Sequence, residues 1–299
     1  MTATGPRPPV AVTIAGTDPS GGAGIQADLK TFTARGAYGA SIITALVAQN
    51  THGVSRIYEI DHDFVIDQFD SVVDDIHVDA TKSGMLGTPE LVQTTADYAA
   101  AGRLGFLVVD PVMVATSGHR LLAENAIDAV RTVLLPQAGL ITPNLPEAAL
   151  LLGDDEPEAG SPAQMREQAA RLLKMGPKAV LLKGGHGADD IVTDILAVAE
   201  GDDIAWREFS HPRVFSPNTH GTGCTLSAAI AAEVAHRRHA LAQAGEDPSG
   251  ASTGEQLGDA VGAALEYLAR AIGSAADWQL ALNPDGAHGP VDHIVDITR

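Results

Sequence analysis

The sequence contains one cysteine, Cys224, among 299 residues. A single cysteine excludes a disulfide within the chain and is typical of a reducing compartment, so we expect a cytoplasmic protein. Residues 1–9 are polar, contain proline and lack the apolar core of a signal peptide, and we expect a flexible lead-in. No apolar run approaches the roughly 18 residues that a membrane-spanning helix needs, so no membrane association is expected.

Basic residues are scarce as well. The chain has 19 Lys and Arg against 38 Asp and Glu, a formal net charge of −19. Binding to a nucleic acid or to an anionic membrane requires clustered cations, so neither is expected as a partner. A phosphate group bound by this protein must therefore be held by local devices, such as backbone amides, a metal ion, or one or two lysines.

The hydrophobic content of 45% is enough for a large core, and we expect one domain over residues 1–299. Strand-like runs alternate with helical periodicity. The expected strands cover residues 10–16, 40–47, 106–109, 140–142, 179–183 and 191–198, and the expected helices 25–35, 63–73, 89–101, 121–134, 162–175, 222–238 and 256–272. This alternation predicts an α/β fold, a mostly parallel sheet with helices on both faces and functional sites at the carboxyl ends of the strands. Residues 153–162 and 244–254 are predicted surface loops.

The most informative motif is NTHGTGCT, residues 218–225, which precedes an alanine-rich helical segment. Its glycines allow close approach of the backbone to a ligand, and the free N–H groups of a first helical turn favour an anion. An ordinary helix start with tight packing explains the same residues. The segment alone leaves both interpretations open.

The turn after the first expected strand is also rich in glycine, with the sequence AGTDPSGGAG over residues 15–24. Such a loop can lie against a flat small molecule, although a tight turn between a strand and a helix has the same composition. Its spacing matches neither a dinucleotide-binding fingerprint nor a P-loop. Asp28, in the following helix, is either a solvated helix residue or a ligand contact.

Polar residues follow three further strands. Asp110 ends one strand, and Asn144 and Glu147 follow the next in TPNLPE. Mg²⁺ prefers oxygen ligands, so these residues suit a metal that bridges nucleotide phosphates. Asn144 as a helix cap, with Glu147 in the first turn, is the alternative. Lys183, in KGGH, could donate to a phosphoryl oxygen, whereas His186 is interpreted as a loop residue.

Six motifs in this order carry a resemblance to a known family. They are SGGAGIQADLK (20–30), LVAQNTHG (46–53), KSGML (82–86), TPNLPE (142–147), KGGH (183–186) and NTHGTGC (218–224). Together they resemble the hydroxymethylpyrimidine/phosphomethylpyrimidine kinases of thiamine biosynthesis, in the ribokinase-like family, from Val10 to about Val291. The resemblance implies a ribokinase-like fold, ATP and Mg²⁺ as cofactors, and a homodimer. It also implies phosphorylation of 4-amino-5-hydroxymethyl-2-methylpyrimidine to its monophosphate and then to its diphosphate.

The resemblance also implies roles for individual residues. The pyrimidine substrate would contact Gln49, Gly16, Met85 and Val112, and we add Asp28 as a candidate substrate contact from its place after the glycine-rich turn. ATP would lie against Asn144, Glu147 and Lys183, and Mg²⁺ against Asp110 and Glu147. The anion hole would be formed by the backbone amides of Gly221, Thr222, Gly223 and Cys224. Separately from the resemblance, phosphoryl transfer needs water to be excluded from ATP, so we expect a lid formed by residues 47–54 or by residues 215–220.

Cys224 departs from the pattern of many ribokinase-like sugar kinases, which carry an aspartate there as the catalytic base. A thiol at a helix N-terminus has a lowered pKa, so we predict that Cys224 is the base for the first phosphorylation. The second acceptor is an ionised phosphate ester and needs little base. A small cysteine that fills space under the helix is the alternative.

Two other functions remain open. The first is pyridoxal kinase, from the same family, although Gln49 and Met85 favour the pyrimidine. The second is a catalytically silent sensor of a nucleotide or pyrimidine. Such a protein would be expected to lack at least one of four residues, and all four are present. They are Asp110, Glu147, Lys183 and Cys224.

Overall fold

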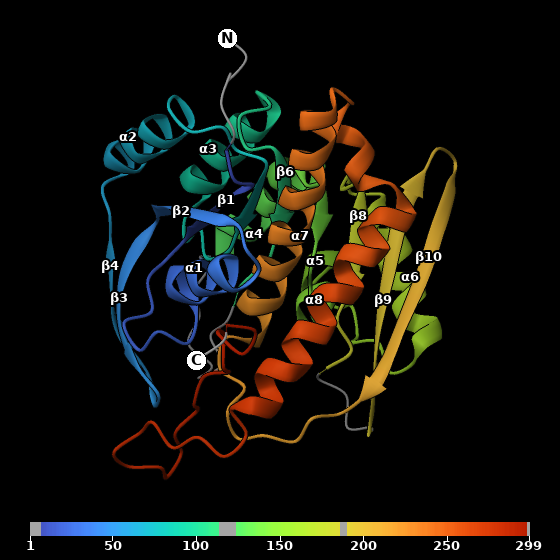
Figure 1. The fold of residues 1–299 in the computed structure, drawn as a ribbon. Helices are drawn as coiled ribbons and strands as arrows, with labels where there is room; N and C mark the ends of the chain where they lie inside the picture. The colour runs from blue at the N-terminus through green and yellow to red at the C-terminus, as the bar shows by residue number, and fades with distance from the viewer. Residues whose placement is uncertain (1–6, 114–123, 186–189, 298–299) are drawn as a thin grey trace.

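The computed structural model describes residues 7–113, 124–185 and 190–297 (Figure 1). His186, residues 121–123 of an expected helix and residues 1–6 of the expected lead-in lie outside this range. Over the part of the chain that is described, no helix is both long enough and apolar enough to cross a membrane.

An eight-stranded sheet forms the centre of the molecule (Figure 1). Its strands are β1 (Val10–Ala15), β2 (Tyr38–Ile43), β5 (Ala80–Ser83), β6 (Phe106–Val109), β7 (Leu140–Ile141), β8 (Ala179–Leu182), β9 (Ile191–Glu200) and β10 (Asp203–Pro212). The strand order is β10-β9-β8-β7-β6-β5-β1-β2. The six strands from β2 to β8 in this order pair in parallel. Strand β9 pairs antiparallel with both β8 and β10. The prediction of a mostly parallel sheet is confirmed.

Helices cover both faces of this sheet. They are α1 (Gly24–Ala34), α2 (His62–Val73), α3 (Pro89–Ala100), α4 (Glu124–Ala129), α5 (Leu145–Leu152), α6 (Pro162–Leu173), α7 (Thr222–Ala244) and α8 (Gly254–Ser274). A π-helical turn, Val130–Leu134, and a 3₁₀ turn, Leu135–Gln137, continue α4. Helices α1, α7 and α8 pack on one face and α2 to α6 on the other. Alternate strand residues supply the two cores, since Val12 and Ile14 face α2 to α6 while Ala11 faces α7.

The strand expected over residues 40–47 is in fact two strands, and the prediction of one was wrong. Thr44 interrupts the run, because its backbone N–H donates to Ala15 O (3.0 Å) and its hydroxyl donates to Met85 O (2.7 Å). The chain then leaves the main sheet and forms a hairpin of β3 (Ala45–Asn50) and β4 (Gly53–Glu59). Three strands, β4, β5 and β10, were not predicted. All three contain many polar residues, although β5 is fully buried.

The two predicted surface loops lie between helices. Residues 153–161 connect α5 to α6, and α7 continues to Ala244 before a short 3₁₀ helix, Pro248–Ser252, that leads to α8. After α8 the chain follows an irregular course beside the loop that precedes α7 (Figure 1). There the backbone N–H of His220 donates to Gly289 O (3.0 Å), and the backbone N–H of His288 donates to Thr51 O (2.7 Å) at the hairpin turn. This C-terminal segment thus connects the hairpin with the start of α7.

Candidate active site

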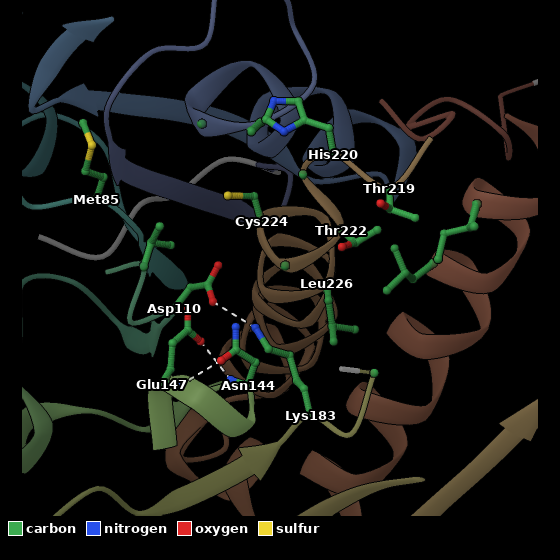
Figure 2. Close-up of a pocket in the computed structure, with 18 of the residues that line it drawn as sticks. Met85, Asp110, Asn144, Glu147, Lys183, Thr219, His220, Thr222, Cys224 and Leu226 are labelled. Carbon is green, nitrogen blue, oxygen red and sulfur yellow. Dashed lines mark hydrogen bonds and ion pairs between the residues drawn. The ribbon is translucent and has the colours of Figure 1, made fainter. Parts of the chain in front are cut away.

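A cavity of about 870 Å³ lies at the carboxyl ends of the parallel strands. Residues that follow β1, β5, β6, β7 and β8 line it, together with the β3–β4 hairpin and the first turn of α7. Of the thirteen residues given a role in the sequence analysis, all but Asp28 line this cavity. They are Gly16, Gln49, Met85, Asp110, Val112, Asn144, Glu147, Lys183, Gly221, Thr222, Gly223 and Cys224. Figure 2 shows ten lining residues with their labels.

The first turn of α7 is presented to the cavity by a glycine that no other residue could replace. Gly221 has φ +80°, and a Cβ there would collide with the carbonyl oxygen of Gly22. Within the described ranges no side chain caps this helix N-terminus, and residues 221–224 all line the cavity. The positive end of the helix dipole therefore faces the cavity, as expected for an anion site.

Lys183 and Asp110 face this turn (Figure 2). Lys183 Nζ lies 3.2 Å from Asp110 Oδ1, which also accepts the hydroxyl of Thr142 at 3.2 Å. A Cβ on Gly223 would lie 3.5 Å from Lys183 Nζ and 3.7 Å from Asp110 Oδ2. Burial opposes the charge of Lys183, but the carboxylates Asp110 and Glu147 outweigh it and raise its pKa. Lys183 is therefore a cation next to the helix N-terminus.

Asn144 and Glu147 form a capping box at the start of α5, as the alternative interpretation of the sequence expected. The backbone N–H of Glu147 donates to Asn144 Oδ1, and that of Asn144 donates to Glu147 Oε2, each at 2.8 Å. The cap does not exclude a role in ligand binding, because both residues also line the cavity. Burial and the neighbouring Asp110 raise the pKa of Glu147 to about 7, although Lys183 opposes the shift.

The carboxylates suit Mg²⁺ rather than a metal with a full protein cage. Among the described residues, no group of three or more His, Cys, Asp and Glu side chains is placed to hold a metal ion. Mg²⁺ is usually bound by one or two carboxylates, with waters and substrate phosphates completing its shell. Asp110 and Glu147 supply two carboxylates beside the anion-binding turn, so the residues present fit this ion.

Toward the hairpin, Gly16, Val47, Met85 and Val112 line the cavity, and this mostly apolar part is called the slot below. Met85 packs with Ala45 and Val47 of the hairpin, and a Cβ on Gly16 would collide with Met85 Cε. The absence of a side chain at Gly16 therefore lets Met85 take its position beside the slot. Gln49 adds an amide at the hairpin side of the slot. A flat ring with polar edges fits such a slot.

Asp28 was predicted as a substrate contact, and the structure corrects this prediction. Its carboxylate is fully buried and does not line the cavity, so a solvated helix position is excluded as well. It accepts hydrogen bonds from Lys82 Nζ (2.9 and 3.1 Å) and from the hydroxyl of Thr13 (2.6 Å). Lys82, which the sequence analysis gave no role, is the member of this pair that lines the cavity. A lysine inside a short strand was the signal that could have identified it.

Asp18 is a second residue that the sequence analysis missed. It is 1% exposed, and its carboxylate accepts the backbone N–H groups of Ser20 and Ala23 at 2.9 and 2.8 Å. Oδ2 also lies 2.8 Å from His220 Nε2, and that nitrogen lies 3.1 Å from Gln49 Nε2. Asp18 follows β1 in the glycine-rich turn. His220 is 202 residues away in the chain, so no local sequence pattern could predict that the two side chains meet.

The pKa of Cys224 differs from the expectation of a lowered value. Burial raises the pKa of its thiol to about 11, and the carboxylates Asp28 and Asp110 add to the increase. Lys82 opposes the shift without overcoming it. The thiol is therefore protonated near neutral pH, because the loss of solvation outweighs the cation Lys82 and the hydrogen bond from the backbone of Gly24.

Comparison with known proteins agrees with this geometry. The family model described as phosphomethylpyrimidine kinase matches residues 18–246. The hydroxymethylpyrimidine/phosphomethylpyrimidine kinase of Escherichia coli (strain K12) is 55% identical over 222 residues, which cover 74% of this chain and 81% of that protein. The protein of the same name from Streptomyces coelicolor is 44% identical over 298 residues, 98% of each chain.

A solved structure has a similar fold. The pyridoxal kinase from Staphylococcus aureus in complex with AMP-PCP and pyridoxal superposes with a TM-score of 0.77 at 30% identity, over 97% of this chain and 95% of that one. The fold is therefore ribokinase-like, as the sequence predicted. From the family match and the identity to these relatives, the chain belongs to the phosphomethylpyrimidine kinase family.

Proposed function

We propose that this protein phosphorylates 4-amino-5-hydroxymethyl-2-methylpyrimidine with ATP, and then phosphorylates the monophosphate to the diphosphate, in thiamine diphosphate biosynthesis. The names of its relatives support the reaction, and one observation in the structure carries it. Lys183, Asp110 and the uncapped first turn of α7 surround one space, and the slot at Gly16 and Met85 opens beside it. A flat acceptor can thus lie next to the phosphoryl group that it receives.

The catalytic contribution of these residues is positioning and charge neutralisation. Phosphoryl transfer passes through a transition state whose charge is spread over the transferred oxygens. The amides of residues 221–224 and the ammonium of Lys183 are donors around that charge. When bound, Mg²⁺ supplies further charge neutralisation on the nucleotide phosphates, and we propose Asp110 and Glu147 as the side chains that hold it.

The acceptor is proposed to lie between Gly16, Met85 and Val112, with its polar edge on Gln49. Asp28 is excluded from this set, because it acts behind Lys82 rather than at the surface of the cavity. Cys224 belongs to the anion-binding turn, and its thiol lies on the side of that turn toward Met85 (Figure 2). This position suits a group that touches the acceptor hydroxyl.

Pyridoxal is the second candidate acceptor, since the S. aureus structure named above holds pyridoxal. Assays with Mg²⁺ and ATP on the purified protein would compare hydroxymethylpyrimidine, its monophosphate and pyridoxal, with ³¹P NMR to identify the products. Conversion of both pyrimidine species, ending in the diphosphate, is the expected result. Turnover of pyridoxal alone would move the assignment to pyridoxal kinase, and no turnover of any of the three would support a silent sensor.

We also propose that the protein is a cytoplasmic homodimer of one domain. Exposed hydrophobic side chains on β2, on the hairpin and on α2 support a surface that another subunit covers. These side chains belong to Tyr38, Leu46, Tyr58 and Phe64. Sedimentation velocity of the purified chain would test the dimer, and a monomer at micromolar concentration would contradict it.

Gly223→Ala is expected to reduce turnover without destabilising the fold. A Cβ at Gly223 would make only ordinary contacts, 3.5 Å to Lys183 Nζ and 3.7 Å to Asp110 Oδ2, and alanine favours a helix more than glycine does. The methyl group would nevertheless occupy the space proposed for the transferred phosphoryl group. We expect kcat/KM to fall by about 10- to 100-fold, since misplacement of a reacting group by about 1 Å can cost about 100-fold.

The matched control is Gly273→Ala, near the end of α8, where a Cβ would meet nothing within 4 Å. Both variants should unfold at or slightly above the temperature of the parent protein, and the control should keep its activity. Full activity of Gly223→Ala would show that the phosphoryl group lies elsewhere.

A further inference from the structure

Three polar side chains from distant parts of the chain meet at one edge of the proposed acceptor slot. They are Asp18 in the turn after β1, His220 in the loop before α7, and Gln49 in β3. His220 Nε2 lies 2.8 Å from Asp18 Oδ2 and 3.1 Å from the atom placed as Gln49 Nε2. Asp18 and His220 are 1% and 8% exposed. This arrangement determines which hydrogen-bonding group Gln49 can present to a ligand.

Asp18 can only accept hydrogen bonds at neutral pH. Burial alone would raise its pKa, but hydrogen bonds from His220 and Ser20 outweigh burial and lower the pKa to about 2. An ionised carboxylate has no proton to donate. The contact of 2.8 Å therefore requires that His220 carry a proton on Nε2 and donate it to Asp18.

A protonated Nε2 has no lone pair left, so it cannot accept a hydrogen bond from the NH₂ group of Gln49. The oxygen and nitrogen ends of a glutamine amide have nearly the same shape, and a half-turn of the amide exchanges them. The orientation that forms a hydrogen bond is the half-turned one, in which the Gln49 oxygen lies toward His220 and shares the Nε2 proton with Asp18. The NH₂ group then points away from His220, and Gln49 lines the cavity.

The loops that carry these residues are held by other contacts. Asp18 N donates to Gln26 Oε1 (2.7 Å) in α1, and the backbone N–H of His220 donates to Gly289 O (3.0 Å) in the C-terminal segment. A Cβ on Gly22 would collide with the His220 ring, so Gly22 lies directly against it. The imidazole therefore has little freedom to turn away from Asp18.

We propose that Asp18 and His220 are positioning residues that fix Gln49 with its amide NH₂ group toward the acceptor, so that the site selects a ring that presents a nitrogen lone pair. In the aminopyrimidine, that atom is the ring nitrogen beside the amino group. The inference rests on the proposed contact between Gln49 and the acceptor. It adds the chemical basis of selectivity at that contact and two residues that set it.

The first test needs neither substrate nor activity. NMR of the ligand-free protein labelled with ¹⁵N-histidine would show which ring nitrogen of His220 carries the proton, with the His220→Gln variant used to assign the signals. A proton on Nε2 is the expected result. An unprotonated Nε2 with the proton on Nδ1 would overturn the inference, and this outcome would leave the proposed kinase activity untouched.

The second test separates selectivity from a general structural role. An analogue in which the ring nitrogen beside the amino group is replaced by C–H should reduce kcat/KM of the parent protein by about 10- to 100-fold, because a buried donor loses its partner. In His220→Ala, the amide is free to turn. The KM for the pyrimidine should rise by a similar factor with kcat within about threefold, and the discrimination against the analogue should shrink to about threefold or less.

His220→Gln is the matched variant, since its side-chain NH₂ group can donate to Asp18 where Nε2–H did. It should restore most of the discrimination between the two acceptors. A purely structural role for His220 would weaken activity on both acceptors equally, so unchanged discrimination in His220→Ala would overturn the inference. Thermal unfolding of both variants checks that they are folded.

Discussion

Replacing Cys224 by alanine is expected to lower kcat for the hydroxymethyl acceptor by about 10²- to 10⁴-fold, the usual contribution of a general base. Phosphorylation of the monophosphate should stay within about tenfold of the parent rate, because that acceptor is an ionised phosphate ester. The thiol lines the cavity at the first turn of α7, beside the proposed slot. The measurement is kcat for each acceptor separately, at saturating Mg²⁺ and ATP.

The rate of the first phosphorylation should also depend on pH. With the pKa of Cys224 at about 11, only a small fraction of the thiol is ionised at pH 7, and that fraction grows about tenfold per pH unit. The rate of the first phosphorylation should therefore increase from pH 7 to pH 9, whereas the second should not. In Cys224→Ala the increase should disappear. Loss of both reactions in folded Cys224→Ser that still binds both ligands would refute the division of labour, as would a flat profile in the parent protein.

Lys82→Met is expected to reduce the free energy of unfolding by about 3–5 kcal/mol, the usual effect of removing one partner of a buried ion pair. Lys82 and Asp28 are both fully buried and 2.9 Å apart. Burial lowers the pKa of Lys82, but Asp28 and other anionic groups raise it by more. The lysine is therefore a cation in the folded protein. Without it, Thr13 is the one hydrogen-bond partner that the described residues leave to Asp28. Denaturant unfolding monitored by circular dichroism would measure the loss.

The loss should also depend on pH. Burial raises the pKa of Asp28 in the folded protein, and it should rise further without Lys82. A carboxyl group whose pKa is higher in the folded state binds protons preferentially there, so the destabilisation should be smaller at pH 5 than at pH 8. The double variant Lys82→Met, Asp28→Leu removes both charges and should recover most of the stability. A loss of less than about 1 kcal/mol in Lys82→Met would contradict the buried ion pair.

The sequence predicted those parts of the site whose residues directly follow a recognisable strand or begin a recognisable helix. Asp110, Asn144 and Lys183 each follow an apolar run, and parallel strands bring their carboxyl ends to one edge, so their convergence required only the strand assignments. Glycine at 221 and 223 before a helix predicted the turn that faces the cavity. The family resemblance added Gln49 and Met85, which periodicity alone would have placed in a strand or a loop.

What remained hidden depends on tertiary contacts. Lys82 lies in a strand of mixed polarity. Its ammonium group can be buried because the carboxylate of Asp28, in α1, neutralises its charge. His220 acquires a partner 202 residues away, and no local pattern encodes that pairing. The pKa of Cys224 depends on how much solvent the surrounding fold removes, which a helix position cannot indicate. Thr44 ends β2 because it donates hydrogen bonds to Ala15, at the end of β1, and to Met85, just after β5. The residues on either side of Thr44 favour a continuous strand.

The burial of α7 has a consequence for how the chain is made. Residues 225–232 of this helix are buried on every side, and α7 packs against β1, β5 and β6. Those strands are synthesised more than a hundred residues earlier. Until α7 is made, apolar side chains such as Phe106 and Val108 lack the helix that they pack against in the folded protein. At about 5–20 residues per second, the part of that face of the sheet not covered by α1 stays exposed for several seconds or more on the ribosome. Nascent chains of this protein are therefore expected to be chaperone clients until α7 emerges.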